Sequence, residues 1–569
     1  MPPSVDPKAP RLLMLFSATF TLASCLSQQI LQVGAVLLPN DASIVSSTRS
    51  DIVDTGYARY LGNRTYPNTV AYLGIPYAEP PLGERRFRAP VPLDIHRVVR
   101  ETKGGVVDAR DYPDFCIQGT IGAGDAGGAG SEDCLKVNIY APAGAKRGSN
   151  LPVLVYTHGG GFTYGNPRNW PFDHWINQSP NVVIVSVYYR LSSFGFLATP
   201  AFSDPTVGDF NAGFLDQVQA LRWVRANIAS FGGDARKVTI NGESAGGASV
   251  ALHLVASTRN EGLYRAAIGQ SVWRTPVPTP EEQRPLFEFY SKHAGCGEGS
   301  AVTQVACLRK ASVSALARAQ DAAVPPLFNG GYNRFRPVLD GKVITDYPTR
   351  SFLTGNFAKV PLIVGSTTND SVSGGTDIAA NLRGSFPSIS NAAINALIEA
   401  YPLADFNSSV ALQLQTILGD AQLRCAGYIM GTAFSKVAKS WTYRYNQPTP
   451  GAVAVHHAAE NWMMFKGTST GFNGTTTFEP QSPTEEAFAE ELIAYWLSFV
   501  RSRNPNTFKL ARSPTWTEYA PTSARIVLTA GPTVEPGTGV VSGTTLEVES
   551  ETGIARCKLV ASQVDEQQN

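Results

Sequence analysis

The sequence predicts an α/β fold in which helices cover both faces of a large, mainly parallel β-sheet. The first observation is a set of short apolar runs, rich in β-branched residues, which are typical of buried parallel strands. These runs cover residues 151–157, 181–188, 238–241, 360–364 and 440–445. The second observation is the helical patterning between them, clearest over residues 216–228, where apolar side chains recur at three- and four-residue spacing. Alternating strands and helices place helices on both faces of such a sheet.

The composition supports a large packed core and argues against a nucleic-acid partner. The chain has 569 residues, of which 43% are hydrophobic. Its 47 basic and 46 acidic residues are spread along the sequence and leave a net charge of +1. Binding to a phosphate backbone would require a basic block, and the sequence has none. We therefore expect no nucleic-acid partner.

The first thirty residues have the pattern of a secretory signal. Lys8 and Arg11 precede an apolar run over residues 12–26, which is short for a membrane span and suits the apolar core of a signal peptide. We expect a signal peptide over residues 1–27 with an open cleavage point, a secreted, extracellular protein, and no stable membrane insertion. Two alternatives stay open: an N-terminal helix packed on the body, and a bacterial lipoprotein box at residues 22–25.

The cysteines agree with export. Of the seven, Cys25 falls in the expected leader, and an even number remains. An even remainder is typical of disulfides formed in an oxidising compartment, so three disulfides are expected. The six cysteines are Cys116, Cys134, Cys296, Cys307, Cys425 and Cys557. Sequons that begin at Asn63, Asn407 and Asn473 are candidate glycosylation sites in a eukaryotic host.

The clearest chemical motif is a glycine-flanked serine between a strand and a helix. The strand at residues 238–241 is followed by Gly242-Glu243-Ser244-Ala245-Gly246-Gly247 and then by a helical run over residues 248–255. In the α/β-hydrolase fold, a Gly-x-Ser-x-Gly turn in this context lifts a nucleophilic hydroxyl above the sheet. The turn also places the serine at a helix N-terminus, which favours developing negative charge. Ser244 is therefore the candidate nucleophile.

A glycine-rich turn upstream supplies the second part of such a site. His158-Gly159-Gly160-Gly161-Phe162 directly follows the strand at residues 151–157. Attack on an ester carbonyl creates an oxyanion, which needs preorganised N–H donors. We expect these donors to be the backbone N–H groups of Gly160, Gly161 and Ala245. A flexible turn without this role would not explain its position after a buried strand.

With these motifs together, the chain resembles the type-B carboxylesterase and lipase family, which includes the cholinesterases. The likeness extends from about residue 41 to about residue 560. The matching motifs are residues 72–81 (YLGIPYAEPP), 86–87 (RF), 131–135 (SEDCL), 158–162 (HGGGF), 231–234 (FGGD) and 242–247 (GESAGG). The resemblance implies a single α/β-hydrolase domain over residues 28–569, a small-molecule ester substrate, no metal and no organic cofactor. It leaves the oligomeric state open.

The resemblance also implies structural roles for several residues. The family's disulfides would join Cys116 to Cys134, Cys296 to Cys307, and Cys425 to Cys557, although spacing alone supports only the first two as short loops. Glu132 and Arg86 match a buried structural ion pair of the family. Ser271 matches a serine that lies near the catalytic residues.

The general base must be a histidine far downstream of Ser244, because the order along this fold is Ser, acid, His. Only His456 and His457 meet this condition. The family histidine precedes two small or polar residues and then an acid, which fits His457 followed by Glu460. His456 remains the alternative base. A metal site on His457 and Glu460 is disfavoured, because the zinc motifs of this spacing carry another histidine where this chain has Asn461.

The acid is expected at a strand end. After residues 360–364 the chain reads Gly-Ser-Thr-Thr-Asn-Asp-Ser, and Asp370 is the candidate. Family members carry Glu followed by Gly at the positions of Asp370 and Ser371, so this chain departs at both. An aspartate can orient the imidazole equally well, but its shorter side chain requires the loop to come closer to His457. The alternative is a solvated turn acid, and Asp370 also lies in a sequon that begins at Asn369.

The loop between Cys116 and Cys134 bears on the substrate. In family lipases this loop is a long amphipathic lid, whereas here it has 17 residues, six of them glycine, with Ile117 and Ile121 as its only large apolar side chains. We therefore expect an esterase for soluble or short-chain esters. The alternatives are a lipase on longer-chain acylglycerols and a cholinesterase-like binding protein without catalysis. The loop also has no aromatic residue, so we do not expect choline esters to be preferred.

The predicted reaction is acyl transfer to water through an acyl-enzyme on Ser244. Activity should fall as pH drops through the pKa of His457, which is nominally about 6.5. Three aromatic residues, Phe162, Trp170 and Trp273, could line the substrate pocket or belong to the core.

Overall fold

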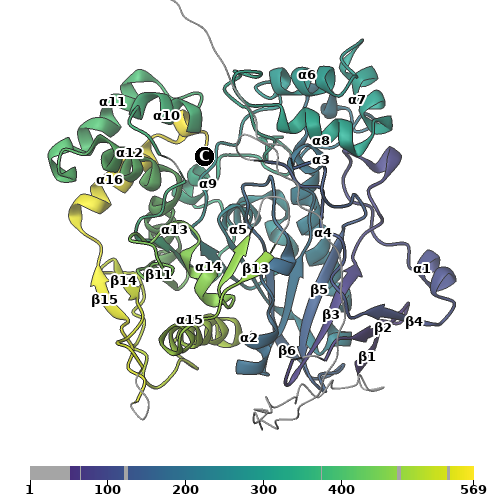
Figure 1. The fold of residues 1–569 in the computed structure, drawn as a ribbon, viewed down its shortest axis with the longest axis horizontal. Helices are drawn as coiled ribbons and strands as arrows, with labels where there is room; N and C mark the ends of the chain where they lie inside the picture. The colour runs from purple at the N-terminus through teal and green to yellow at the C-terminus, as the bar shows by residue number, and fades with distance from the viewer. Residues whose placement is uncertain (1–50, 65, 121–125, 373, 471–475, 535–538) are drawn as a thin grey trace, which may run out of the picture. The chain divides into compact units, whose positions relative to one another are not determined.

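The predicted α/β architecture is present, built around a ten-stranded sheet (Figure 1). In spatial order its strands are β15 (Thr545–Val548), β14 (Ala524–Leu528), β11 (Ser440–Tyr445), β10 (Leu362–Thr367), β9 (Ala266–Gln270), β8 (Gly233–Glu243), β6 (Leu151–Thr157), β7 (Val183–Val187), β5 (Lys136–Pro142) and β3 (Thr69–Pro76). From β14 to β7 every neighbouring pair is parallel, and antiparallel pairs close both edges.

The structure is a computed structural model that describes residues 51–64, 66–120, 126–372, 374–470, 476–534 and 539–569. The expected signal peptide over residues 1–27, the domain boundary at residue 28 and the sequon at Asn473 lie outside these ranges. Two predicted strands have the observed bounds, those at 151–157 and 440–445. The strand predicted at 238–241 begins earlier, at Gly233, because Gly233 pairs with Leu151 although Arg236 and Lys237 interrupt the apolar run.

Two smaller sheets and a set of helices complete the fold. The small sheets are β1 (Ile52–Asp54), β2 (Arg59–Gly62) and β4 (Val106–Ala109), and the hairpin β12 (Thr468–Thr470) and β13 (Thr476–Phe478). The helices are α1 (Ile95–Thr102), α2 (Asp173–Gln178), α3 (Ser192–Phe196), α4 (Ala212–Asn227), α5 (Ala245–Val255), α6 (Arg284–His293), α7 (Ala301–Lys310), α8 (Val313–Asp321), α9 (Pro348–Thr354), α10 (Ile378–Ser385), α11 (Asn391–Ala400), α12 (Val410–Gly419), α13 (Cys425–Ser435), α14 (Ala459–Met464), α15 (Pro483–Ser502), α16 (Glu551–Ser562) and α17 (Val564–Gln567). Figure 1 shows α6, α7 and α8 grouped above one side of the sheet and α10, α11 and α12 above the other.

The sheet separates two hydrophobic cores, because successive side chains of a strand point to opposite faces. On β6, Val153 and Val155 belong to the core beneath α4, α5 and α13, whereas Leu154 and Tyr156 belong to the core beneath α2, α14 and α15. Every one of these four side chains is buried. Burial on both faces explains why the parallel strands appear in the sequence as continuous apolar runs.

The topology brings the predicted site segments to one edge of the sheet. The glycine turn follows β6, the serine turn follows β8 and the acid follows β10, and all three strands are parallel. Thr157 at the end of β6 pairs with Gly242 near the end of β8. The carboxyl ends of parallel strands therefore meet where ligands of open α/β sheets bind.

The disulfides and the ion pair implied by the resemblance are present. The three disulfides are Cys116–Cys134, Cys296–Cys307 and Cys425–Cys557. The Arg86 guanidinium binds the Glu132 carboxylate through two bonds of 2.7 and 2.6 Å, and both side chains are close to fully buried. Arg86 also donates to three backbone carbonyls near the end of α7. Glu132 is therefore a structural residue that ties the first disulfide loop to the body.

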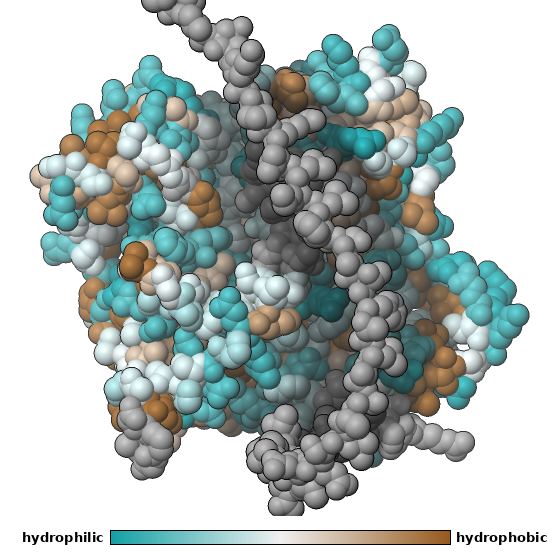
Figure 2. Space-filling model, viewed as in Figure 1, coloured by the Kyte–Doolittle hydropathy of each residue, from teal (hydrophilic) through white to brown (hydrophobic). Residues whose placement is uncertain are grey.

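On the coloured part of the face in Figure 2, hydrophobic and hydrophilic residues are interspersed. In the described part of the chain, no helix combines the length and the apolar character that crossing a membrane requires.

Candidate active site

Ser244 occupies a strained turn between β8 and α5. Its φ of 59° and ψ of −120° are conformations that residues with side chains rarely adopt. The turn is possible because glycine stands on both sides. A Cβ on Gly242 would lie 2.4 Å from backbone atoms of Gly246, and a Cβ on Gly246 would lie 2.1 Å from the carbonyl oxygen of Thr157. The motif therefore folds as predicted, with the hydroxyl of Ser244 facing a cleft.

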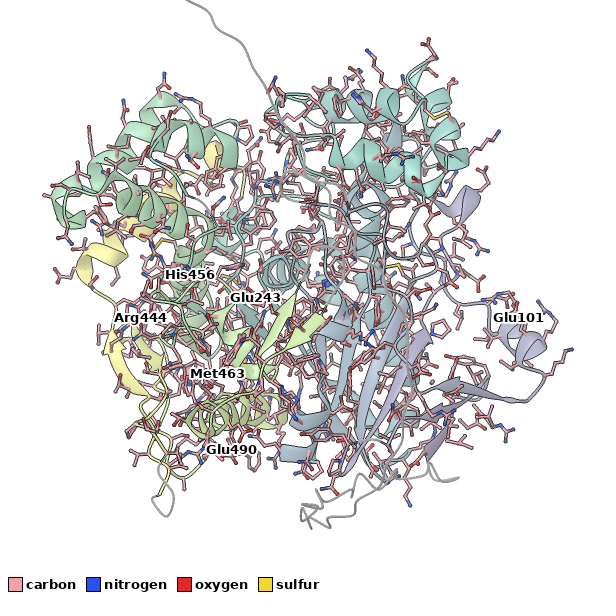
Figure 3. The ribbon with its side chains drawn as sticks, viewed as in Figure 1. Glu101, Glu243, Arg444, His456, Met463 and Glu490 are labelled. Carbon is pink, nitrogen blue, oxygen red and sulfur yellow. A yellow bond between two sulfur atoms is a disulfide. The ribbon has the colours of Figure 1, made fainter. Side chains whose placement is uncertain are left out.

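The structure brings Ser244, His457 and Asp370 into one hydrogen-bonded line. Nε2 of His457 lies 2.8 Å from Oγ of Ser244, and Nδ1 lies 2.7 Å from Oδ1 of Asp370. His457 follows a loop and stands two residues before α14. The side chain of its neighbour His456 is exposed, to the left of Glu243 in Figure 3. Of the two candidate histidines, only His457 contacts the serine.

Asp370 is fully buried, and its carboxylate is held on both oxygens. Oδ2 accepts a 2.6 Å bond from the hydroxyl of Ser271 and a 3.2 Å bond from the backbone N–H of Thr367. Gly419 at the end of α12 packs closely against the Asp370 backbone, and a Cβ there would lie 2.2 Å from the backbone oxygen of Asp370. Asp370 is thus a buried, oriented carboxylate rather than a solvated turn acid.

The glycine turn after β6 folds back on itself and leaves N–H groups unused. The N–H groups of Thr163 and Tyr164 both donate to the carbonyl of Gly160, which has a φ of 101°. Within the described ranges, the N–H groups of Gly160, Gly161 and Ala245 donate to no protein acceptor. Such free donors beside a nucleophile can bind a developing oxyanion.

His158 supports this turn as a neutral ring. Burial lowers the pKa of His158 to about 4, although its contact with the Gly159 carbonyl opposes the shift. The ring is stacked against Tyr189 and Trp170, at centroid distances of 4.5 and 5.8 Å. Its Nδ1 donates to the Gly159 carbonyl at 2.8 Å, which fixes the tautomer.

Two further carboxyl groups surround the imidazole. Oε1 of Glu243 lies 3.4 Å from Nε2 of His457, and Oε2 accepts a 3.0 Å bond from Asn461. Glu460 is equally buried and accepts a 3.3 Å bond from the hydroxyl of Tyr443. Burial raises the pKa of Glu243, although the His457 imidazole opposes the shift; burial and the neighbouring Glu243 and Asp370 raise the pKa of Glu460.

The neighbouring carboxylates change the pKa of the base, His457. Burial alone would lower the pKa of His457, but the negative charges of Asp370 and Glu243 outweigh it and raise the pKa above the ordinary value. A pKa above about 6.5 means that the neutral, proton-accepting form requires a higher pH than a free imidazole would.

The cleft over Ser244 has an empty volume of about 810 Å³. Its lining residues are Gly160, Gly161, Tyr164, Trp170, Glu243, Ser244, Trp273, Arg334, Val372, His457, Ala458, Asn461, Trp462 and Thr468. Of the three aromatic residues that could line the pocket or belong to the core, Trp170 and Trp273 line the cleft, and Phe162 is fully buried in the core. The described residues include no group of three or more His, Cys, Asp or Glu side chains that could hold a metal ion.

Comparison with known proteins identifies the family. The sequence profile of the carboxylesterase family matches residues 49–538. The chain belongs to the carboxylesterase family. It is a carboxylic ester hydrolase, and its substrates are small-molecule esters.

Similar proteins and a solved structure support this family assignment. The acetylcholinesterase of Bungarus fasciatus is 31% identical over 499 residues, which cover 80% of this chain and 78% of that protein. The crystal protein of Dictyostelium discoideum is 30% identical over 457 residues, covering 76% of this chain and 79% of that protein. The crystal structure of EstA from Aspergillus niger superposes with a TM-score of 0.77 at 28% identity, covering 91% of this chain and 99% of that chain.

Sequence reasoning missed part of this carboxylesterase site. Glu243 stands directly before the nucleophile in the motif, but its side-chain direction cannot be inferred from the pattern. In the sequence Asn461 serves only as an argument against a zinc motif, whereas in the structure its side-chain amide donates to Glu243. Tyr164 and Trp462 line the cleft without any sequence signal beyond their closeness to the glycine turn and to His457.

Proposed function

We propose that this carboxylesterase hydrolyses its substrates through an acyl-enzyme on Ser244, with His457 as general base and Asp370 as the orienting acid. The support is the pair of short contacts at 2.8 and 2.7 Å that join the hydroxyl, the imidazole and the buried carboxylate. This arrangement suits proton transfer from a serine to an oriented imidazole.

In the first half of the reaction, Oγ of Ser244 attacks the ester carbonyl carbon while Nε2 of His457 takes its proton. The carbonyl oxygen becomes an oxyanion that accepts hydrogen bonds from the N–H groups of Gly160, Gly161 and Ala245. The C–O bond to the alcohol then breaks, and the imidazolium of His457 gives its proton to the departing alcohol. Asp370 stabilises the imidazolium without taking the proton.

In the second half, water replaces the alcohol. His457 removes a proton from water, the hydroxide attacks the acyl-enzyme carbonyl, and a second oxyanion forms in the same place. Its collapse breaks the bond to Ser244, which recovers its proton from His457, and the carboxylic acid leaves. No metal or organic cofactor takes part in these steps.

We infer a preference for soluble or short-chain esters. The glycine-rich loop between Cys116 and Cys134 offers little apolar surface for a lid, and hydrophobic residues on the coloured face of Figure 2 lie among hydrophilic ones. The competing proposal is a lipase on longer-chain acylglycerols. Hydrolysis rates for a series of acyl chain lengths, each measured below and above the solubility limit, separate the two. A rate that rises steeply when an oil phase appears would favour the lipase.

We also propose that the protein is secreted after removal of a signal peptide that lies within about residues 1–27, with its cleavage point open. The three disulfides are consistent with an oxidising compartment. Expression of the full chain in a secreting host, followed by intact mass measurement of the medium protein, tests this. A protein that stays in the cells with residues 1–27 attached would contradict it.

Covalent labelling distinguishes catalysis from a binding role without turnover. A serine-directed organophosphate should add one phosphoryl group, and peptide mapping should place it on Ser244. The Ser244→Ala variant is the matched control and should not be labelled. An unlabelled wild-type protein with no ester hydrolysis would favour the binding protein.

A further inference from the structure

Gln118 is a buried glutamine that holds the far end of the glycine turn. It lies two residues after Cys116 in the first disulfide loop and is fully buried. Its side-chain carbonyl accepts a 2.7 Å bond from the N–H of Gly165, and its amide nitrogen donates a 3.0 Å bond to the Gly165 carbonyl. The same amide nitrogen donates a 2.7 Å bond to the carbonyl of Cys116. Both amide hydrogens of Gln118 are therefore used.

The side-chain amide of Gln118 bonds both the N–H and the carbonyl of Gly165, as a backbone residue on a neighbouring β-strand would. Next to it, the N–H of Gly119 donates a 2.9 Å bond to the carbonyl of Thr163. The limb of the turn from Thr163 to Gly165 is thus attached at both of its ends to the disulfide loop. The segment before the glycines continues from β6. The N–H groups of Gly160 and Gly161 therefore lie between β6 on one side and the segment held by the disulfide loop on the other.

A second buried amide holds Gln118 in turn. Nε2 of Gln320, near the end of α8, donates a 3.0 Å bond to the backbone carbonyl of Gln118. The side-chain oxygen of Gln320 accepts bonds from the N–H and the hydroxyl of Ser193 in α3, at 3.2 and 2.6 Å. Helices α3 and α8 lie next to each other in Figure 1. A chain of satisfied buried polar groups of this kind rigidifies its surroundings.

The turn needs such an external support. Gly159, Gly160 and Gly161 have no side chains with which to pack, and glycine loses more conformational freedom on ordering than any other residue. Oxyanion donors are effective only when they are held in place before the charge develops. Among the contacts of the turn, the paired bonds of Gln118 come from a side chain, so they can be removed without changing the backbone sequence of the turn.

We propose that Gln118 is a positioning residue for the oxyanion hole, acting through Gly165 to fix the N–H groups of Gly160 and Gly161. This inference rests on the proposed function, because it presumes that these groups bind the oxyanion. It concerns the rate of the chemical step and not the binding of substrate. Gln118 itself does not line the cleft.

The test compares Gln118→Met with wild type. Methionine has a similar size and removes all three bonds. The concentration of competent active sites is first measured by titration with an organophosphate, so that unfolded protein is left out when kcat is calculated. Per titrated site, we expect kcat to fall by at least about tenfold, because misplaced oxyanion donors cost part of the 10²–10³ that one donor supplies. KM should change less than twofold.

A trifluoromethyl ketone provides a readout that a purely structural role would not move. Oγ of Ser244 adds to its carbonyl carbon, the carbonyl oxygen becomes an alkoxide in the oxyanion hole, and the serine proton passes to His457. The inhibition constant of this adduct should rise by the same factor as kcat/KM falls. Gln118→Glu keeps the acceptor for Gly165 and loses the donors, so it should lie between wild type and Gln118→Met in both measurements.

Gln304→Met is the matched control. Gln304 is a buried glutamine in the second disulfide loop, and its amide nitrogen donates two 3.2 Å bonds to the carbonyls of Gly297 and Gly299. It should lose thermal stability while keeping kcat and the inhibition constant per titrated site. If Gln118→Met also keeps both values, the inference is wrong. If the wild-type protein is neither titrated by the organophosphate nor inhibited by the ketone, the proposed function itself fails.

Discussion

The carboxylate of Asp370 and the imidazole of His457 are joined by a 2.7 Å contact between Oδ1 and Nδ1, and the aspartate is completely buried. The family resemblance implies a longer glutamate at this position. Gly419 packs closely against the Asp370 backbone, where a Cβ would lie 2.2 Å from the backbone oxygen. The contact determines which nitrogen of His457 faces Ser244, and the first three predictions depend on it or on its surroundings.

Asp370→Asn should leave the fold intact and reduce kcat by about 10⁴-fold. The amide retains the shape of the carboxylate, but it favours the wrong tautomer of His457 and cannot stabilise the imidazolium. Steady-state kinetics with a soluble ester measure the effect, and a thermal melt checks the fold. A well-folded Asp370→Asn enzyme with near wild-type kcat would mean that another residue is the acid.

Ser271→Ala should lower kcat by roughly tenfold to a hundredfold. The serine hydroxyl donates a 2.6 Å bond to Oδ2 of Asp370, and a hydrogen bond to a charged group contributes about 1.5–3 kcal/mol. Its loss leaves the carboxylate held on that oxygen by the Thr367 N–H alone. Ser271→Thr, which keeps a hydroxyl, serves as the comparison. Equal activity of the alanine and wild-type enzymes would show that the Ser271 hydroxyl does not contribute to catalysis.

The pH dependence should show a single acid limb with a midpoint above pH 6.5. His457 must be neutral to accept the serine proton, so activity is lost as pH falls through its pKa, and that pKa is raised by Asp370 and Glu243. Glu243→Gln removes the carboxylate that lies 3.4 Å from Nε2, and the midpoint of kcat/KM should therefore move to lower pH. A midpoint that stays in place or rises would contradict this electrostatic account.

The three disulfides should contribute unequally to stability. In the loop-closure description, the Cys425–Cys557 bridge, with a separation of 132 residues, contributes about 5 kcal/mol. The Cys296–Cys307 bridge, with a separation of 11, contributes about 3 kcal/mol. Replacing each pair by serine and measuring denaturant unfolding tests the order. A larger loss from the shorter loop would show that local packing, rather than chain entropy, dominates.

Much of the fold and of the site followed from sequence patterns that depend on local physics. Buried parallel strands are apolar on both faces, so β6 and β11 could be located to the residue. The elbow around Ser244 has strict glycine requirements, and chain order then limited the base to His456 or His457. The choice between those two, and the assignment of Asp370, depended on the family resemblance rather than on spacing.

The remaining features depend on contacts between distant segments. Glu243 is adjacent to Ser244, yet its proximity to His457 arises from a loop more than two hundred positions away. Gln118 has no motif of its own, and its contact with Gly165 appears only when the disulfide loop is folded against the glycine turn. The sequence left Phe162 as either pocket wall or core, and the structure places it in the core with a left-handed backbone.

The most direct test of the account is the hydrolysis of a soluble short-chain ester by Ser244→Ala and wild-type protein, compared at equal concentrations of folded enzyme. We expect kcat/KM of the alanine variant to fall by at least about 10⁴-fold while its thermal melt stays unchanged. A folded Ser244→Ala protein that retains wild-type turnover would contradict it.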